Sequence, residues 1–203
     1  KRSSIVSRGK EIGYTPRSMR AAEMGINIVA TNLIPEELAP SMTLVRGTRF
    51  RGIDANNANS YYFIVSESIT ANINNDSFTY SNVVLKEGAF VNFNYVVNKI
   101  NNPSLLFEIP HENVDTSTLR VRVQDSSSSQ IINTYTLAEH VFEADGESLI
   151  FFLQENYKGR YEIQFGDGVL GKTLTDGNIV LMDYIVTSGS LANGLSKVIA
   201  VDP

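Results

Sequence analysis

The stretch VNFNYVVN, residues 91–98, alternates apolar and polar side chains, and this pattern decides the fold class. A period of two puts every second side chain on the same face, which is typical of a strand with one face buried. The same alternation recurs in LRVRV at residues 119–123 and in YEIQF at residues 161–165. Three nearly continuous apolar runs suit strands covered on both faces: Tyr61–Val65, Leu149–Leu153 and Ile179–Val186.

Segments rich in Asn, Ser, Asp and Gly separate these runs and predict turns. They lie at Asp54–Ser60, Asn72–Ser77 and Asp125–Gln130. Strands spaced by turn signals, with few helical segments between them, indicate an antiparallel, β-sandwich-like body.

Only the N-terminal segment has a helical pattern. Thr15 is a good helix cap, and Pro16 follows it with its φ already set for a first turn. Met19, Ala22 and Ile26 then recur at helical spacing. We therefore expect a mainly β (α+β) fold, with a short N-terminal helical segment followed by one or more β domains.

The division of the chain into domains follows from these patterns. We expect a helical segment at 1–30, a β domain at 31–110 and a second β domain at 111–194, with a boundary near Pro110. The alternative is one long sandwich without a break. Because the chain begins without Met, we expect it to be a fragment of a longer protein, with 195–203 as a linker to a further region.

The composition excludes several classes of site. The 203 residues include no Cys and only two His, which excludes disulfide scaffolds, Cys-ligated zinc, iron–sulfur clusters and thiol catalysis. No apolar run approaches the ~20 residues of a membrane span. We expect no cofactor, no metal site and no membrane partner.

The charge is unevenly distributed along the chain. Residues 1–20 hold six basic side chains and one acidic one, a net charge of +5, so the remaining residues carry −10 of the total of −5. A basic arm on an acidic body suits an acidic protein partner. The alternative is a solvated helix face near a truncation point. A nucleic-acid partner is not expected, because the arm has little aromatic interleaving. We therefore predict an interface at Arg8, Arg17 and Arg20.

The string GDGVLGKT, residues 166–173, fits two phosphate-binding patterns. The residues Gly166, Gly171, Lys172 and Thr173 match the loop of nucleotide hydrolases, and Gly168 completes the dinucleotide fingerprint. Both patterns need a following helix, because the phosphate binds to the amides at its N-terminus.

The residues after this string leave no room for that helix. An Asp-Gly-Asn turn at 176–178 leads directly into the strand-like run 179–186. We interpret Gly166, Asp167, Gly168 and Gly171 as a structural turn between two strands, with glycine supplying positive φ. A nucleotide site here is disfavoured.

No set of residues predicts catalysis. Nothing local brings His111 and His140 together as metal ligands, and no Gly-x-Ser-x-Gly elbow is present. The carboxylates near Glu143 and Glu147 lie in a glycine turn, without the cleft that a sugar hydrolase needs. The chain is therefore not expected to be an enzyme.

An ordered set of sequence blocks resembles the signature of baseplate J-like proteins, the wedge subunits of contractile phage tails. The blocks are YEIQFGDGVLGK at 161–172, DGNIV at 176–180, Tyr184, Thr187, Gly189 and ANG at 192–194. Two upstream blocks, GYTPRSMRAA at 13–22 and VDTSTLRVRV at 114–123, resemble the inner-ring wedge subunit of T4-like phages.

The resemblance implies a structural role without catalytic residues or cofactors. Such subunits bind copies of themselves and other wedge proteins, form a ring around the tail hub, and rearrange on host attachment so that the sheath contracts and the genome is ejected. It implies assembly in the host cytoplasm and location in the tail baseplate of the virion. The alternative is a carbohydrate-binding β module for host recognition, with a groove lined by Tyr61, Tyr62 or Tyr157.

Overall fold

The computed structural model describes residues 18–31, 39–53, 59–138, 145–195 and 197–201. Their contacts divide the chain into two compact units. Unit 1 contains Ser18 and Val91–Tyr184, and unit 2 contains Met19–Phe90 and the residues from Ile185 onward. Each unit is built around one antiparallel-rich sheet, so the expectation of a mainly β fold is confirmed.

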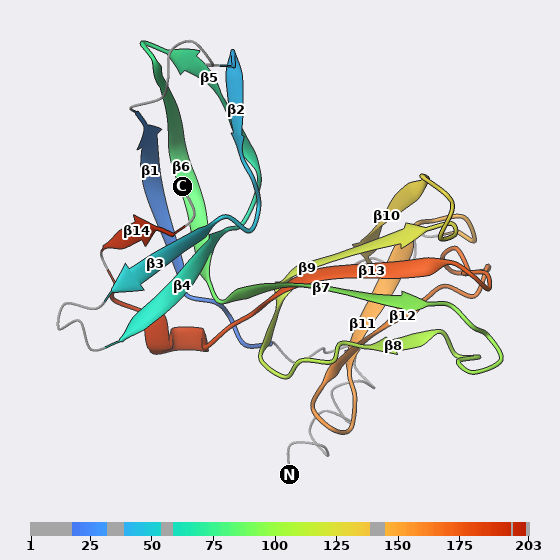
Figure 1. Ribbon diagram of the computed structural model, residues 1–203. Helices are drawn as coiled ribbons and strands as arrows, with labels where there is room; N and C mark the ends of the chain where they lie inside the picture. Colours follow the sequence, from blue (N-terminus) through green and yellow to red (C-terminus); the bar gives the residue numbers. More distant parts are fainter. Residues whose placement is uncertain (1–17, 32–38, 54–58, 139–144, 196, 202–203) are drawn as a thin grey trace. The chain divides into compact units, whose positions relative to one another are not determined.

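Unit 2 holds a sheet of seven strands in the order β14-β3-β4-β6-β5-β2, with β1 paired to β6 (Figure 1). The strands are β1 (Glu23–Ala30), β2 (Ser41–Leu44), β3 (Arg49–Ile53), β4 (Ser60–Val65), β5 (Ile69–Asn74), β6 (Ser77–Glu87) and β14 (Val198–Ala200). A single 3-10 turn, η3 (Gly189–Ala192), precedes β14 among the described residues. Every pairing described in this sheet is antiparallel.

Strand β6 is the longest element of unit 2 and connects its parts. The N-terminal end of β6 pairs with β5, its C-terminal end pairs with β4, and β1 runs along it from Phe78 to Lys86. Its apolar side chains Phe78, Tyr80, Val83 and Leu85 are all buried. They form the unit 2 core with aromatic residues of β3 and β4.

The β5–β6 connection is a two-residue turn, shorter than the loop expected at Asn72–Ser77. Asn75 and Asp76 have φ values of 48° and 54°. Positive φ at both central positions is the geometry of a type I′ turn, whose twist matches that of the flanking strands. Asn and Asp tolerate this conformation better than most residues with a Cβ.

The predicted N-terminal helix is wrong where the structure describes it. Residues 18–22 form no helix, and Glu23–Ala30 is strand β1. Met24, Ile26 and Ile28 alternate towards the core, and β-branched side chains favour a strand over a helix. The pairing of β1 with β6 satisfies its backbone. The rest of the expected segment, residues 1–17, lies outside the described residues.

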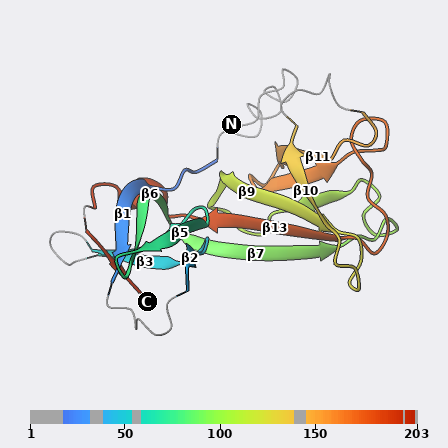
Figure 2. The same cartoon turned by 90° about the horizontal axis from the view of Figure 1, so that it is seen from above.

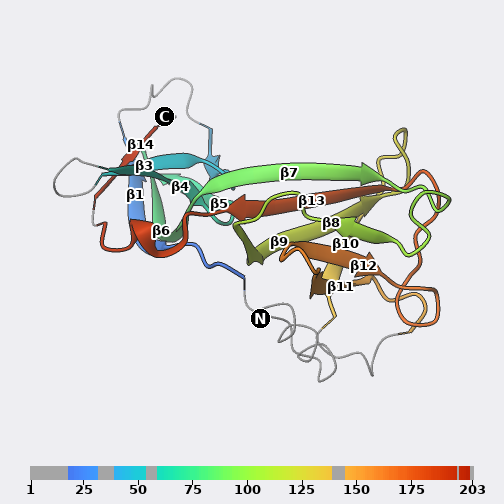
Figure 3. The same cartoon turned by 90° about the horizontal axis from the view of Figure 1, so that it is seen from below.

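Unit 1 holds the second sheet, in the order β7-β13-β9-β10-β11-β12-β8. The strands are β7 (Ala89–Val96), β8 (Leu106–Glu108), β9 (Val114–Gln124), β10 (Ile132–Leu137), β11 (Ile150–Glu155), β12 (Tyr161–Phe165) and β13 (Ile179–Val186). Strands β7, β13 and β9 run side by side in Figures 2 and 3. Strands β10 and β11 are parallel, which the antiparallel expectation did not include.

A chain of aromatic rings runs through the unit 1 core. The ring centroids of Phe93 and Tyr95 are 5.1 Å apart, those of Tyr95 and Phe107 5.5 Å, and those of Phe107 and Phe165 5.7 Å. Tyr135 contacts Phe165 from the other side at 5.2 Å. These are ordinary edge and tilted contacts for aromatic pairs. The strands expected at 91–98, 119–123 and 161–165 are confirmed as parts of β7, β9 and β12.

The two units divide the chain differently from the expected ranges 31–110 and 111–194. Residues 91–110 belong to unit 1, and the residues after Tyr184 return to unit 2. Strand β7 pairs with β13, far along the sequence, and this long-range pairing has no local signal. Across the described residues, no helix has the length and apolar character needed to cross a membrane.

Candidate functional site

The glycine turn that follows β12 is centred on Asp167. Its Oδ1 accepts hydrogen bonds from the amides of Val169 at 2.9 Å and Leu170 at 3.0 Å. These amides, Leu170 first, hold the pKa of the Asp167 carboxyl below its ordinary value. The Gly168 amide donates to the Gly171 carbonyl at 3.0 Å. A phosphate bound in this turn would need the amides of Val169 and Leu170. The Asp167 carboxylate already accepts their hydrogen bonds.

Close backbone packing explains two of the glycines. A Cβ at Gly166 would lie 2.1 Å from the Gly171 carbonyl oxygen. Gly171 has a φ of 81°, and a Cβ there would lie 2.8 Å from Cγ1 of Ile150. The turn thus closes on itself and on β11, leaving no space for a side chain at either position.

A second loop, residues 145–148, fixes this turn from outside. The Gly171 amide donates to the Asp145 carbonyl and the Lys172 amide to the Ser148 carbonyl, both at 2.8 Å. Lys172 Nζ lies 3.7 Å from Glu147 Oε2. Its ammonium group therefore faces a carboxylate of the same unit. The residues that matched a phosphate loop are used to join two loops.

The residues predicted as an interface are only partly described. Arg8 and Arg17 lie outside the described residues, as do His140 and Glu143. Arg20 is exposed in the extended segment that precedes β1. The predicted interface therefore stays a prediction.

His111 contacts a buried tyrosine in unit 1. Its Nδ1 lies 2.8 Å from the hydroxyl of Tyr184, which is fully buried in β13. Burial raises the pKa of Tyr184 to about 12. The hydrogen bond gives the buried hydroxyl a partner, which explains this histidine without a catalytic role. No group of three or more His, Cys, Asp or Glu residues in the described ranges could hold a metal ion.

Two charged contacts hold elements of unit 1 together, one between β8 and the β11–β12 connection and one between two strands. Arg160 Nη1 donates to Glu108 Oε1 at 2.9 Å, and Asn156 Nδ2 donates to Glu108 Oε2, also at 2.9 Å. The Arg160 hydrogen bond is the main reason that the pKa of Glu108 lies below its ordinary value. Arg122 Nη2 pairs with Asp183 Oδ2 at 2.7 Å and joins β9 to β13. These hydrogen bonds and ion pairs hold parts of the unit 1 sheet together.

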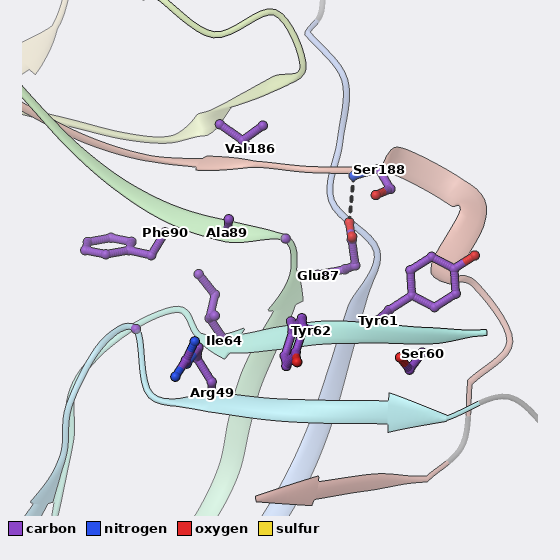
Figure 4. Close-up of a pocket in the computed structure, with 12 residues that line it drawn as sticks. Arg49, Ser60, Tyr61, Tyr62, Ile64, Glu87, Ala89, Phe90, Val186 and Ser188 are labelled. Atoms are coloured by element: carbon purple, nitrogen blue, oxygen red, sulfur yellow. Dashed lines mark hydrogen bonds between the residues drawn. The ribbon is translucent and has the colours of Figure 1, made fainter. Parts of the chain in front are cut away.

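A pocket that combines aromatic and charged side chains lies in unit 2, on the outer face of β3 and β4 (Figure 4). Its volume is about 570 Å³. Arg49 and Tyr62 point to this face. Arg49 pairs with Ile64, and the side chains of paired residues share a face. Tyr62 lies two residues before Ile64 in β4, so its side chain is on the same face. Glu87 and Ser188 complete the opposite side.

Sequence patterns identified only part of this pocket. Tyr61 and Tyr62, two of the residues expected to line a sugar-binding groove, both line this pocket, whereas the exposed Tyr157 lies in unit 1. Glu87 and Arg49 gave no signal, because a carboxylate at a strand end and an arginine in a strand are common on protein surfaces.

Comparison with known proteins identifies a relative among phage tail proteins. No family model matches the chain. The chain is 24% identical over 209 aligned residues to the baseplate wedge protein gp6 of Enterobacteria phage T4. The alignment covers 95% of this chain and 30% of the relative, so the chain spans less than a third of that protein's length. The resemblance expected from the sequence blocks is confirmed: over nearly its whole length, this chain is similar to a segment of a phage baseplate wedge protein.

Proposed function

We propose that this chain is a structural part of a baseplate wedge in a contractile phage tail. The observation that carries the proposal is the alignment with the T4 wedge protein, which extends over 95% of the chain. A match of that extent includes both sheets and their connections, rather than one short motif. The location that follows is the tail baseplate of the virion, after assembly in the host cytoplasm.

The sheet edges support a role in assembly. Strands β1, β2 and β14 of unit 2, and β7 and β8 of unit 1, each pair with one neighbour among the described strands. An edge strand can pair with a strand of another chain, which is a common mode of protein association. We propose that contacts of this kind join the chain to other wedge proteins and to further copies of itself.

Two exposed apolar side chains lie at one end of unit 1, near a loop that a hydrogen bond holds in place. Val96 is 66% exposed and Ile100 is 88% exposed. The loop that carries Ile100 is fixed by the Lys99 amide, which donates to Asp176 Oδ1 at 2.6 Å. Apolar side chains held in a fixed exposed loop suit the buried centre of a protein–protein interface.

The proposed role includes a rearrangement. We propose that the ring of such subunits surrounds the tail hub, and that a change in its contacts on host attachment triggers sheath contraction and genome ejection. We further propose that the chain catalyses no reaction and binds neither cofactor, nucleic acid nor membrane. The Asp167 carboxylate at the amides of the glycine turn supports this view for nucleotides.

Co-purification tests the proposal directly. The full-length parent protein is expressed with the other wedge proteins of the same phage, and complexes are isolated through a tag on one partner. We expect the parent to enter a stable complex with at least one wedge protein and to appear in purified tails. Isolation of the parent alone, from every pairwise and combined expression, contradicts the proposal.

A further inference from the structure

We propose that the pocket on the outer face of β3 and β4 binds a neutral pyranose sugar. The pocket belongs to unit 2, and its volume of about 570 Å³ lies within the usual range of small-molecule sites. The inference goes beyond the proposed assembly role, because it assigns a ligand to one unit and needs no wedge partner.

Aromatic side chains form the apolar part of the pocket. Tyr62 is half exposed although it lies in a hollow, so one face of its ring is available to a ligand. Phe90 lines the same pocket and is fixed from another side by Arg46, whose guanidinium carbon lies 4.7 Å from the ring centroid. A pyranose ring has an apolar C–H face that can cover such a ring and remove it from water.

A buried carboxylate forms the acceptor side of the pocket. Glu87 is only 3% exposed. Its Oε2 accepts hydrogen bonds from the hydroxyl of Thr187 at 2.5 Å and from the amide of Ser188 at 3.0 Å. Thr187 in turn accepts the Gly189 amide at 2.9 Å. Since these contacts orient the carboxylate before any ligand arrives, little conformational entropy is lost on binding.

An arginine forms the donor side. Figure 4 shows Arg49 and Glu87 on opposite sides of Tyr62. A sugar hydroxyl both donates and accepts, so neighbouring hydroxyls can donate to the carboxylate and accept from the guanidinium. The two charges also select against ions, because a phosphate would meet the Glu87 carboxylate and an ammonium group would meet the Arg49 cation. A neutral polyol with an apolar face satisfies both the rings and the charges.

The test is a titration of the whole chain with sugars, in which binding is measured by calorimetry and by saturation-transfer NMR. The probes are the methyl glycosides of glucose, galactose and N-acetylglucosamine, with the trimer of N-acetylglucosamine to distinguish one ring from a chain of rings. We expect at least one sugar to bind. Tyr62→Ala should weaken that binding by about tenfold or more, which corresponds to about 1.4 kcal/mol, and Tyr62→Phe should keep it.

Matched variants separate the pocket from general surface effects. Tyr157→Ala removes a tyrosine that is 84% exposed in unit 1 and should leave binding unchanged. Glu87→Gln should weaken binding, and its unfolding midpoint is measured in parallel because the side chain is buried. Three results overturn the proposal. The first is no binding of any probe up to about 20 mM, a concentration at which a site with a Kd of 1 mM would be saturated. The others are sugar binding that Tyr62→Ala does not weaken, and saturable binding of a basic peptide in place of a sugar. None of them bears on co-purification with wedge proteins.

Discussion

Two glycines of unit 1 are required for different reasons. At Gly166 the limit is space, because an added Cβ would lie 2.1 Å from a carbonyl oxygen. At Gly177 the limit is conformation, since φ is 86° while no heavy atom lies within 4 Å of the added Cβ. Both glycines belong to the conspicuous glycine-rich region of the sequence, and neither provides a ligand contact.

Replacing these glycines should therefore have unequal effects. Gly166→Ala should reduce the free energy of unfolding by about 3 kcal/mol, the cost of forcing atoms into a filled space. Gly177→Ala should cost about 1 kcal/mol, the penalty of a left-handed conformation for a residue with a Cβ. Urea unfolding curves measure both values. Equal losses would mean that the turn relaxes around the methyl group added by Gly166→Ala without cost.

Glu108 gives a prediction about pH. The Arg160 hydrogen bond lowers the pKa of this carboxyl in the folded chain, so its contribution to stability is complete above the ordinary value of about 4.3 and disappears as the pH falls through the lower folded value. Glu108→Gln should reduce stability at pH 7 by about 0.5–1 kcal/mol, a modest effect because the pair is about one-third exposed. The difference from wild type should shrink below about pH 4.

Glu112, the second carboxylate that contacts Arg160, provides the control for this pH effect. Glu112 also contacts Arg160, but at 3.5 Å and with 77% of its side chain exposed. Glu112→Gln should change stability little at any pH. A loss for Glu112→Gln as large as that for Glu108→Gln would contradict the assignment. Denaturant unfolding across the acid range measures both variants.

At the scale of elements, β1 and β6 show how pairing overrides local pattern. The pairing register between β1 and β6 shifts between Ile26 and Ile28, which leaves an extra residue on β6. Asn82 in this bulge has a φ of 55°, and its amide donates to Asn27 Oδ1 at 2.9 Å. A bulge bends the strand and increases its twist, which suits the long β6 to its several partners.

The β5–β6 turn offers a substitution that should raise the free energy of unfolding. Asp76→Gly should stabilise the chain by about 0.5–1 kcal/mol, because glycine adopts the observed positive φ without the cost that a Cβ imposes. Thr79→Gly, at an exposed position within β6, should destabilise it, since glycine weakens a strand. Thermal unfolding distinguishes the two. Destabilisation by Asp76→Gly would show that the Asp76 side chain makes a necessary contact.

The glycine turn predicts the outcome of nucleotide titration. Calorimetry with ATP and Mg²⁺ should give no binding heat, because the amides of Val169 and Leu170 already bond the Asp167 carboxylate. Lys172→Ala should behave as wild type. Measurable binding that Lys172→Ala abolishes would contradict the interpretation of residues 166–173 as a structural turn.

At the scale of the whole molecule, the chain returns to a unit that it has left. Unit 2 is built from Met19–Phe90 and from the residues after Tyr184. Within it, Glu87 bonds Thr187 and Ser188, and a Cβ at Gly88 would lie 2.3 Å from the Val186 carbonyl. The segment that leaves the unit and the one that returns are thus held together by a buried carboxylate and by glycine packing.

Charge reversal tests the proposed interface at this scale. The triple variant Arg8→Glu, Arg17→Glu and Arg20→Glu changes the arm from net positive to net negative and should weaken co-purification with wedge partners. The weakening should be largest at low salt, where charges are screened least. The control reverses three cations elsewhere, at Arg51, Lys158 and Lys197, all of them exposed. Equal weakening by the two triple variants would assign the effect to total charge.

Much of unit 1 could be predicted from the sequence. The alternation in 91–98, 119–123 and 161–165 is confirmed in β7, β9 and β12, because a half-buried strand must alternate to keep one face dry. The expected helix failed where it is described. In that segment Ala, Met and Gly fit either period, so the partner strand, and not the local pattern, decides the conformation of β1.

The sequence by itself determined the mainly β character, several of the strand stretches, the lack of cysteine and the similarity to a baseplate wedge protein, because these depend on composition, period and the order of motifs along the chain. Only the tertiary structure decided the parallel β10–β11 pair, the return of the chain to unit 2 and the meeting of Arg49, Tyr62 and Glu87 around one pocket. Those features join residues that are distant along the chain. They result from pairing and packing energies summed over the sheet, for which a local stretch carries no signal.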